Sequence, residues 1–172
     1  SDGNNIVIGT GKGRIMLSSD GGNDWKLAYD DAGVVYELAI KDDLIFAGGY
    51  DIYRSTDKGK TWEIKEEGLP DGKIEINDFL VYGEKIFVAA GNGVYYTTDN
   101  GDSWLDISDG LGSSAQCLTV TNNTLYAGTY NNGVYCLDLS FLGVDEYMHV
   151  GKDRIFEAYP NPASDKLTIT AN

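Results

Sequence analysis

The side chains of this sequence that could do chemistry are, above all, its carboxylates. The chain has 172 residues, and 27 acidic against 13 basic residues give it a formal net charge of −14. A glycoside hydrolase needs two carboxyl groups about 5–9.5 Å apart across one cleft. Candidates stand in the loops between the strands predicted below: Asp30, Asp31, Asp51, Glu66, Glu67, Asp71, Asp106 and Asp109. Because carboxylates are so common here that some pair lies close by chance, we assign no catalytic residue.

Aromatic and amide side chains gather in three of these loops, and they suit contacts with a sugar or a peptide. The candidate ligand-binding residues are Tyr50, Asp51, Asn92, Tyr130, Asn131 and Asn132. The alternative is structural, because Asn and Gly also make tight turns against which a tyrosine can pack. Both interpretations stay open at this stage.

The sequence does not contain the residues that several other kinds of site require. The single histidine, His149, excludes a Ser-His-Asp arrangement. We expect Cys117 and Cys136 to be small buried residues on the first and third strands of one sheet, about 9–10 Å apart and beyond the reach of a disulfide. No cofactor and no metal site are expected, because the acidic pairs at 30–31 and 42–43 lack the ordered spacing of a calcium loop.

The charge balance also limits the partners. Nucleic acid and anionic membrane surfaces both require clusters of Lys and Arg, and the chain is strongly acidic. No apolar run approaches the roughly 20 residues of a membrane span. A soluble, self-repelling extracellular surface is therefore expected. The first residues do not read as a signal peptide, so an exported protein is expected to have lost its start in this chain.

The elements that must position these loops are set by a turn signature that occurs three times. The pattern Ser/Thr-x-Asp-x-Gly-x-x-Trp contains all three tryptophans, 37 and 42 positions apart. Its carboxylate can accept backbone N–H bonds within the turn, its glycine supplies a positive φ, and its tryptophan covers the loop at the start of a strand. The twelve residues assigned this structural role are Ser18, Asp20, Gly22, Trp25, Ser55, Asp57, Gly59, Trp62, Thr97, Asp99, Gly101 and Trp104.

Short β-rich runs with glycine turns align around these signatures as repeated hairpins. The second strands of the units are expected at 6–9, 44–48, 86–90 and 125–128, and the third at 15–18, 52–55, 94–97 and 134–137. First strands are expected at 34–40, 74–81 and 115–120, with none in the first unit, and a short fourth strand follows each Trp. The fourth unit has no turn signature and is expected to be incomplete.

The repeated signature resembles the Asp-box of β-propellers, a family that includes sialidases, other polysaccharide hydrolases, sortilin-like receptors and photosystem assembly factors. The resemblance implies an all-β fold: blades of four-stranded antiparallel sheets over residues 1–140, forming a partial propeller. It places the Asp-boxes at the blade periphery, away from any active site. About three and a half blades are fewer than the usual 4–8, so either further blades precede residue 1 or a partner holds the fragment.

Sialidase activity is not expected of this segment. Members with that activity hold the substrate carboxylate with three arginines, and Arg14, Arg54 and Arg154 are not placed to converge.

The C-terminal residues change character. We expect a linker over 141–153, and 154–172 contains the string Tyr-Pro-Asn-Pro-Ala-x-Asp-x-Leu-x-Ile. It resembles the start of the C-terminal sorting domain of the type IX secretion system, a small β-sandwich of which only the first strand is present. The residues that carry the resemblance are Tyr159, Pro160, Asn161, Pro162 and Leu167. A proline-rich turn followed by a strand at 166–170 explains the same residues locally.

Together these features predict a secreted or outer-membrane surface protein of a Gram-negative bacterium, exported by the type IX machinery as its partner. The expected role is a non-catalytic binding or scaffold module for a glycan or a protein. The alternative is a polysaccharide- or sialoside-active glycoside hydrolase whose catalytic residues lie mostly outside this segment. Fold alone does not decide between them.

Overall fold

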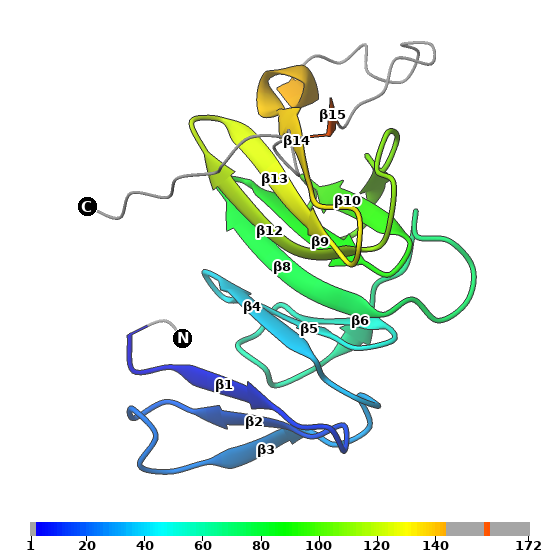
Figure 1. Cartoon of the computed structure of the whole chain (residues 1–172). Helices are drawn as coiled ribbons and strands as arrows, with labels where there is room; N and C mark the ends of the chain where they lie inside the picture. Colours follow the sequence, from blue (N-terminus) through cyan, green and yellow to red (C-terminus); the bar gives the residue numbers. More distant parts are fainter. Residues whose placement is uncertain (1–2, 144–156, 159–172) are drawn as a thin grey trace.

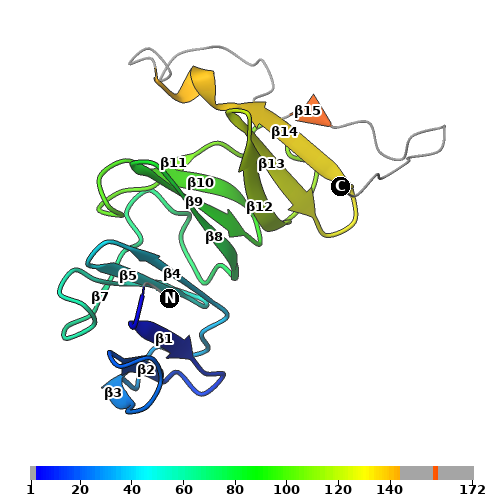
Figure 2. The ribbon, with the colours of Figure 1, turned by 90° about the vertical axis from the view of Figure 1, so that its left-hand side faces the viewer.

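Four small antiparallel sheets follow one another in chain order. A computed structural model of the chain describes residues 3–143 and 157–158. Its sheets lie one after another from the blue N-terminal strands to the yellow and orange ones (Figure 1), and the same succession is seen after a 90° turn (Figure 2). Among the described residues, no helix has the length and apolar character needed to cross a membrane.

Each sheet is a meander of consecutive strands. The first sheet contains β1 (Ile6–Gly9), β2 (Ile15–Ser18) and β3 (Lys26–Tyr29), and the second contains β4 (Glu37–Lys41), β5 (Leu44–Gly48), β6 (Ile52–Ser55) and β7 (Glu63–Ile64). The third contains β8 (Ile76–Tyr82), β9 (Lys85–Ala90), β10 (Gly93–Thr97) and β11 (Leu105–Asp106), and the fourth contains β12 (Ala115–Thr121), β13 (Thr124–Thr129), β14 (Val134–Asp138) and β15 (Glu157–Ala158). A 3-10 turn, Leu139–Gly143, follows β14.

Three details bear on the sequence expectations. The first sheet has three strands and lacks a first strand, as predicted. Each short strand after a turn signature begins one residue beyond the tryptophan, so the tryptophans belong to the turns. The fourth sheet, expected to be incomplete, gains β15, whose Ala158 and Glu157 pair with Tyr135 and Cys136. The residues named for the sorting signal, 159–162 and 167, lie outside the described residues.

The core is divided into three clusters, one in each gap between neighbouring sheets. Ile15 and Tyr53 represent the first gap, Phe46 and Trp104 the second, and Phe87 and Leu125 the third. Strands β9 and β10 are buried along nearly their whole length because sheets cover both of their faces. Strands β7 and β11 lie at the outer edge and are exposed.

The turn signatures are held by their own side chains. In the second one, Ser55 Oγ accepts the Gly59 N–H at 2.7 Å, and Asp57 Oδ1 accepts the N–H groups of Lys60 and Thr61 at 2.9 and 2.8 Å. Thr61 Oγ1 also donates to Asp57 Oδ2 at 2.8 Å. These bonds favour the ionised carboxylate and, with the Ser55 hydroxyl, lower the pKa of Asp57 to about 2. In the first turn, Asp20 Oδ1 likewise accepts the N–H groups of Asn23 and Asp24, and in the third Asp99 Oδ1 accepts that of Ser103 while the Asp102 N–H donates to the Asp99 carbonyl.

The glycines of the second and third turns let each turn approach the preceding sheet. Gly59 and Gly101 have φ values of 85° and 82°. A Cβ atom on Gly59 would lie 2.2 Å from Leu17 Cδ1 in the first sheet, and one on Gly101 would lie 2.7 Å from Phe46 Cε1 in the second. Gly22 also has a positive φ, but its nearest neighbours, in its own sheet, are 3.6 Å away or more. The close contact is therefore a property of the gaps between sheets.

The tryptophans differ in the same way. Trp104 is 2% exposed, packs edge-on against Phe46 of the second sheet, and donates its indole N–H to the Lys65 carbonyl at 3.2 Å. Trp62 lies against Tyr29 of the first sheet but bonds the carbonyl of its own Gly59. Trp25 is 37% exposed. The tryptophan of the same turn signature thus packs in three different ways, depending on which side chains of the preceding sheet it can contact.

The cysteines lie where the sequence places them, but their burial was predicted wrongly. Cys117 on β12 and Cys136 on β14 are separated by β13, and no disulfide joins them. Cys117 is exposed and Cys136 is half-buried. The expectation of burial assumed a neighbouring sheet on both faces of the fourth one, and among the described residues no sheet follows it.

Candidate functional site

One end of the sheets carries most of the residues that the sequence singles out for binding. This Tyr50 face consists of the hairpin loops β5–β6, β9–β10 and β13–β14 and of the connections that lead from one sheet to the next. Backbone bonds join them: Ile74 N–H donates to the Tyr50 carbonyl at 3.3 Å, and Gly91 N–H donates to the Glu75 carbonyl at 2.8 Å. Segment 74–76 therefore lies between the loops of Tyr50 and Asn92.

Tyr50 belongs to an aromatic pair that sequence reasoning missed. Its ring lies edge-on to that of Tyr36, with centroids 5.8 Å apart, and the Tyr36 hydroxyl donates to Tyr50 Oη at 3.2 Å. This bond, partial burial and the charge of Glu75 raise the pKa of the Tyr36 hydroxyl. The rings remain 44% and 40% exposed. The ammonium of Lys73 lies 5.8 Å from the centre of the Tyr50 ring, within the range of a cation–π contact.

The other predicted binding residues are anchored within their own sheet or to the connection between β11 and β12. Asn131 Oδ1 accepts the Ser113 hydroxyl at 3.0 Å, and Asn132 Nδ2 donates to the Gly112 carbonyl at 2.8 Å. Asn92 hydrogen-bonds to Tyr95. Tyr130 is 76% exposed and is held by its backbone N–H, which donates to the Ser114 carbonyl. These contacts leave Tyr130 as a third exposed aromatic side chain on the Tyr50 face, after Tyr36 and Tyr50.

One pair of the candidate carboxylates is in contact. Glu66 and Asp51 are hydrogen-bonded, and burial, that bond and the Asp51 charge raise the pKa of Glu66. The hollow beside them, lined also by Tyr50 and Pro70, has a volume of only about 10 Å³. Carboxylates in hydrogen-bond contact are closer than the roughly 5 Å of a retaining glycosidase. Asp106, a further candidate, accepts the Ser108 N–H at 2.8 Å and stabilises a turn.

Acidic residues also face one another on the first strands of the sheets. Asp78 on β8 accepts the Leu118 N–H of the fourth sheet at 2.6 Å, and burial raises the pKa of its carboxyl group. Burial and the charge of Asp78 raise the pKa of Glu37 on β4. Within the described part of the chain, no group of three or more His, Cys, Asp or Glu side chains could hold a metal ion.

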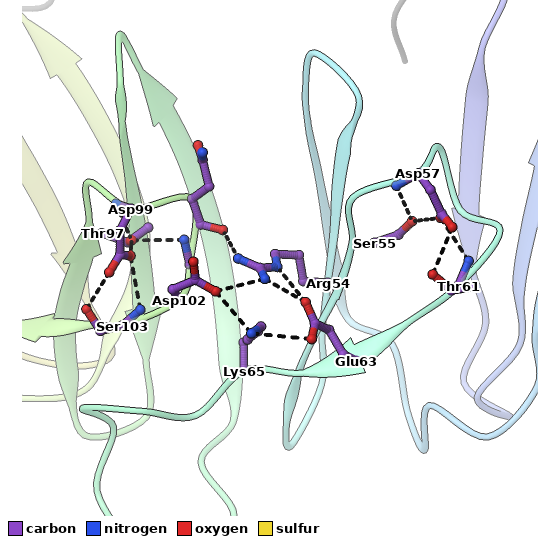
Figure 3. A network of polar contacts seen from close by, with 12 residues as sticks. Arg54, Ser55, Asp57, Thr61, Glu63, Lys65, Thr97, Asp99, Asp102 and Ser103 are labelled. Atoms are coloured by element: carbon purple, nitrogen blue, oxygen red, sulfur yellow. Dashed lines mark hydrogen bonds and ion pairs between the residues drawn. The ribbon is translucent and has the colours of Figure 1, made fainter.

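The opposite end of the sheets, here called the Asp57 face, carries an ion network between the second and third sheets (Figure 3). Arg54, buried on β6, donates to Glu63 Oε1 at 2.6 Å, to Asp102 Oδ1 at 2.9 Å and to the Asn100 carbonyl at 2.7 Å. Lys65 bridges the same two carboxylates at 3.3 and 3.0 Å. Because these groups satisfy one another, the network holds the two sheets together and offers no open site.

Comparison with known proteins is informative at the level of the fold. No protein-family model and no curated protein matches the chain. The structure is similar to that of YCF48 bound to a D1 peptide, with a TM-score of 0.58 and 14% identity over 81% of this chain and 49% of that chain. It is similar to the computationally designed Ika4 protein, with a TM-score of 0.63 and 16% identity over 81% and 88% of the two chains. A GH74 enzyme from Niastella koreensis matches with a TM-score of 0.59 and 21% identity over 79% and 27%.

These similarities show an all-β chain whose small antiparallel sheets resemble part of a β-propeller. The chain spans about half the length of the YCF48 chain and about a quarter of the GH74 enzyme. At such identities the likeness shows the fold alone.

Proposed function

We propose that this chain is part of an Asp-box β-propeller that acts as a non-catalytic binding module and contacts a glycan or a protein ligand through its Tyr50 face. The observation that carries the proposal is the Tyr36–Tyr50 pair. Two rings, fixed edge-on by a hydroxyl bond, remain accessible at 44% and 40% exposure. Exposed, pre-ordered aromatic side chains provide contact area at low entropic cost, and they are enriched at binding surfaces.

The surroundings of the pair suit a polar ligand with an apolar side. Lys73 lies next to the Tyr50 ring, and the amide side chains of Asn131 and Asn132 stand two sheets further along the same face, in the β13–β14 loop. Among proteins of similar fold, YCF48 is bound to a D1 peptide. That neighbour makes a peptide as reasonable a ligand as a glycan.

The test is ligand capture with matched tyrosine variants. The full chain is screened by calorimetry or biolayer interferometry against plant and bacterial polysaccharides, sialosides and extended peptides. Tyr36→Ala and Tyr50→Ala should each weaken the ligand found by about tenfold or more. Tyr82→Ala is the control, because Tyr82 is 41% exposed and lies at the far end of β8. Equal losses in all three variants, or no loss at Tyr50, would refute the assignment.

The proposal includes export by the type IX secretion system to the cell surface or the medium, with the segment 154–172 as the signal. It rests on the sequence of residues 159–162 and on Leu167. Replacing 159–162 with alanines should leave the protein in the periplasm of a type IX-competent host, whereas alanines at 148–151 should not. Both variants keep Glu157–Ala158 and therefore the pairing of β15. Normal export of the first variant would contradict the sorting role.

A glycoside hydrolase whose other catalytic residues lie mostly outside this segment is the second candidate, and one observation favours it: the pKa of Glu66 on the Tyr50 face is raised, as a general acid requires. A GH74 enzyme is among the proteins of similar fold. Sugar release that is abolished by Glu66→Gln but retained by Glu67→Gln would establish this alternative. Binding without turnover would support the binding module.

A further inference from the structure

A cavity of about 560 Å³ opens between the first and second sheets on the Asp57 face. Its walls come from β1, β2 and β3 on one side and from the β4–β5 hairpin and the second turn signature on the other. The apolar lining residues include Ile6, Val7, Leu17, Ile40 and Ile45. A volume of this size lies within the range of about 300–1,000 Å³ found for small-ligand sites.

One aromatic ring of the second gap has no counterpart at this cavity. Strand pairing aligns Val7 on β1 with Phe46 on β5, Phe87 on β9 and Tyr126 on β13. In the next gap, Phe46 is fully buried and packs against Trp104 and Phe79. Valine fills less of the corresponding space than phenylalanine, and the first sheet also lacks a first strand among the described residues, so the first gap is less completely filled than the second.

Two acidic positions of the second gap are occupied by lysines in the first. The cross-strand row Phe46–Arg54–Glu63 of the second sheet corresponds to Val7–Leu17–Lys26 of the first. In the turn signature, Lys60 occupies the place of Asp102. A central arginine with two carboxylates is thereby replaced by a central leucine with two lysines.

The positions of these lysines converge in the equivalent site. In the second gap, Glu63 and Asp102 both lie within 3 Å of one atom, Arg54 Nη2 (Figure 3). Lys26 and Lys60 stand at the same two positions around the cavity, and neither forms an ion pair with any residue that the structure describes. Among the other charged lining residues, Lys58 and Asp43 form an ion pair at 3.1 Å and cancel each other. The remaining charges are those of the two lysines and of Asp42. Positive charge thus predominates around the cavity on a chain of net charge −14.

We propose that this cavity binds a small organic carboxylate, with an aromatic or aliphatic body inserted between the first two sheets and the carboxylate held by Lys26 and Lys60. The body takes the place of the ring that Phe46 supplies in the second gap. The carboxylate takes the place of the Arg54 head group, and Lys26 and Lys60 take the places of Glu63 and Asp102. The site lies at the opposite end of the sheets from the Tyr50 face and is independent of the ligand proposed there.

Calorimetry on the full chain tests the site with 1-naphthaleneacetate and its uncharged amide as probes. We expect one saturable site for the carboxylate and at least tenfold weaker binding of the amide. Val7→Phe restores the missing ring and should weaken carboxylate binding at least tenfold without lowering the melting temperature. The matched control is Val81→Phe, because Val81 lies outside the cavity on β8 at 36% exposure and its replacement should change nothing.

A second variant tests the head group without altering the apolar walls. Replacing Lys26 and Lys60 with glutamine should weaken the carboxylate about tenfold and leave the amide unchanged, and it remains informative if Val7→Phe does not fold. The proposal is overturned if the wild-type chain shows no saturable binding or binds both probes equally. It is also overturned if carboxylate affinity survives both the Val7→Phe and the double lysine replacement.

Discussion

Replacing Arg54 with leucine should separate the contribution of the ion network from that of simple packing. Leucine is the residue that the first sheet carries at the same position, Leu17. Removing one partner of a fully buried charge pair costs about 3–5 kcal/mol. Here the cost is smaller, because the side chains of Glu63 and Asp102 are 52% and 61% exposed and can rehydrate, and because leucine regains apolar burial. We expect the free energy of unfolding to fall by about 2 kcal/mol, or the melting temperature by roughly 4–8 °C.

Urea unfolding followed by tryptophan fluorescence measures this loss, since Trp104 is buried between the second and third sheets. The matched control is Lys58→Leu, which removes an ion pair whose side chains are 67% and 66% exposed. It should change stability by no more than about 0.5 kcal/mol. Added salt should leave the Arg54 effect largely intact, because buried charges are poorly screened. If Arg54→Leu costs no more than the control, or if its cost disappears in salt, the network does not hold the sheets together.

Three further predictions concern the turn signatures. Gly59→Ala should destabilise the chain clearly more than Gly22→Ala, because both residues have positive φ but only a Cβ on Gly59 would collide with Leu17. The melting temperatures of the two variants measure this difference, and equal effects would show that φ alone matters. The pKa values of Asp57 and Asp99 are lowered to about 2, so their stabilising contribution is complete above pH 4 and is lost as the pH falls from about 4 to about 2. In the variant Asp57→Asn, stability should depend less on pH over this range. An unchanged loss of stability in acid would contradict the hydrogen bonds described for Asp57. Asp57→Ala should lower stability without changing the affinity of any ligand of the Tyr50 face, and a stable variant that no longer binds would show a functional role instead.

Much of the sheet order could be predicted because the repeats carry their own markers. Each Ser/Thr-x-Asp-x-Gly-x-x-Trp turn fixes the strand before it, and β2, β6 and β10 end where the sequence places them. The boundaries of the first strand of each sheet were harder to predict. The strand expected at 34–40 is found at Glu37–Lys41, and one reason is that Val35 donates its N–H to the Thr10 carbonyl of the first sheet. A bond to another sheet leaves no periodic trace in the sequence.

The Tyr36–Tyr50 pair shows why the site was only half predicted. Tyr50 could be found because it follows two glycines in a hairpin loop. Tyr36 was counted among the residues of a strand, and its role depends on register: Glu37 pairs with Gly48, which brings residue 36 beside the loop that holds Tyr50. Aligning the predicted strands as cross-strand residue pairs would have identified Tyr36.

In a chain of repeats, a residue that occurs in every repeat is explained by the folding of the repeat. A residue that differs in one repeat indicates a property of that repeat alone. Asp20, Asp57 and Asp99 each accept the backbone N–H four residues further on, so their chemistry is explained by the turn. The change from Phe46 to Val7 has no such explanation, because it forfeits buried contacts that the second gap retains. It coincides with the exchange of both acidic partners of Arg54 for lysines. A loss of packing confined to one gap and matched by a reversal of charge around it is what a binding site requires, and it is not what the fold requires.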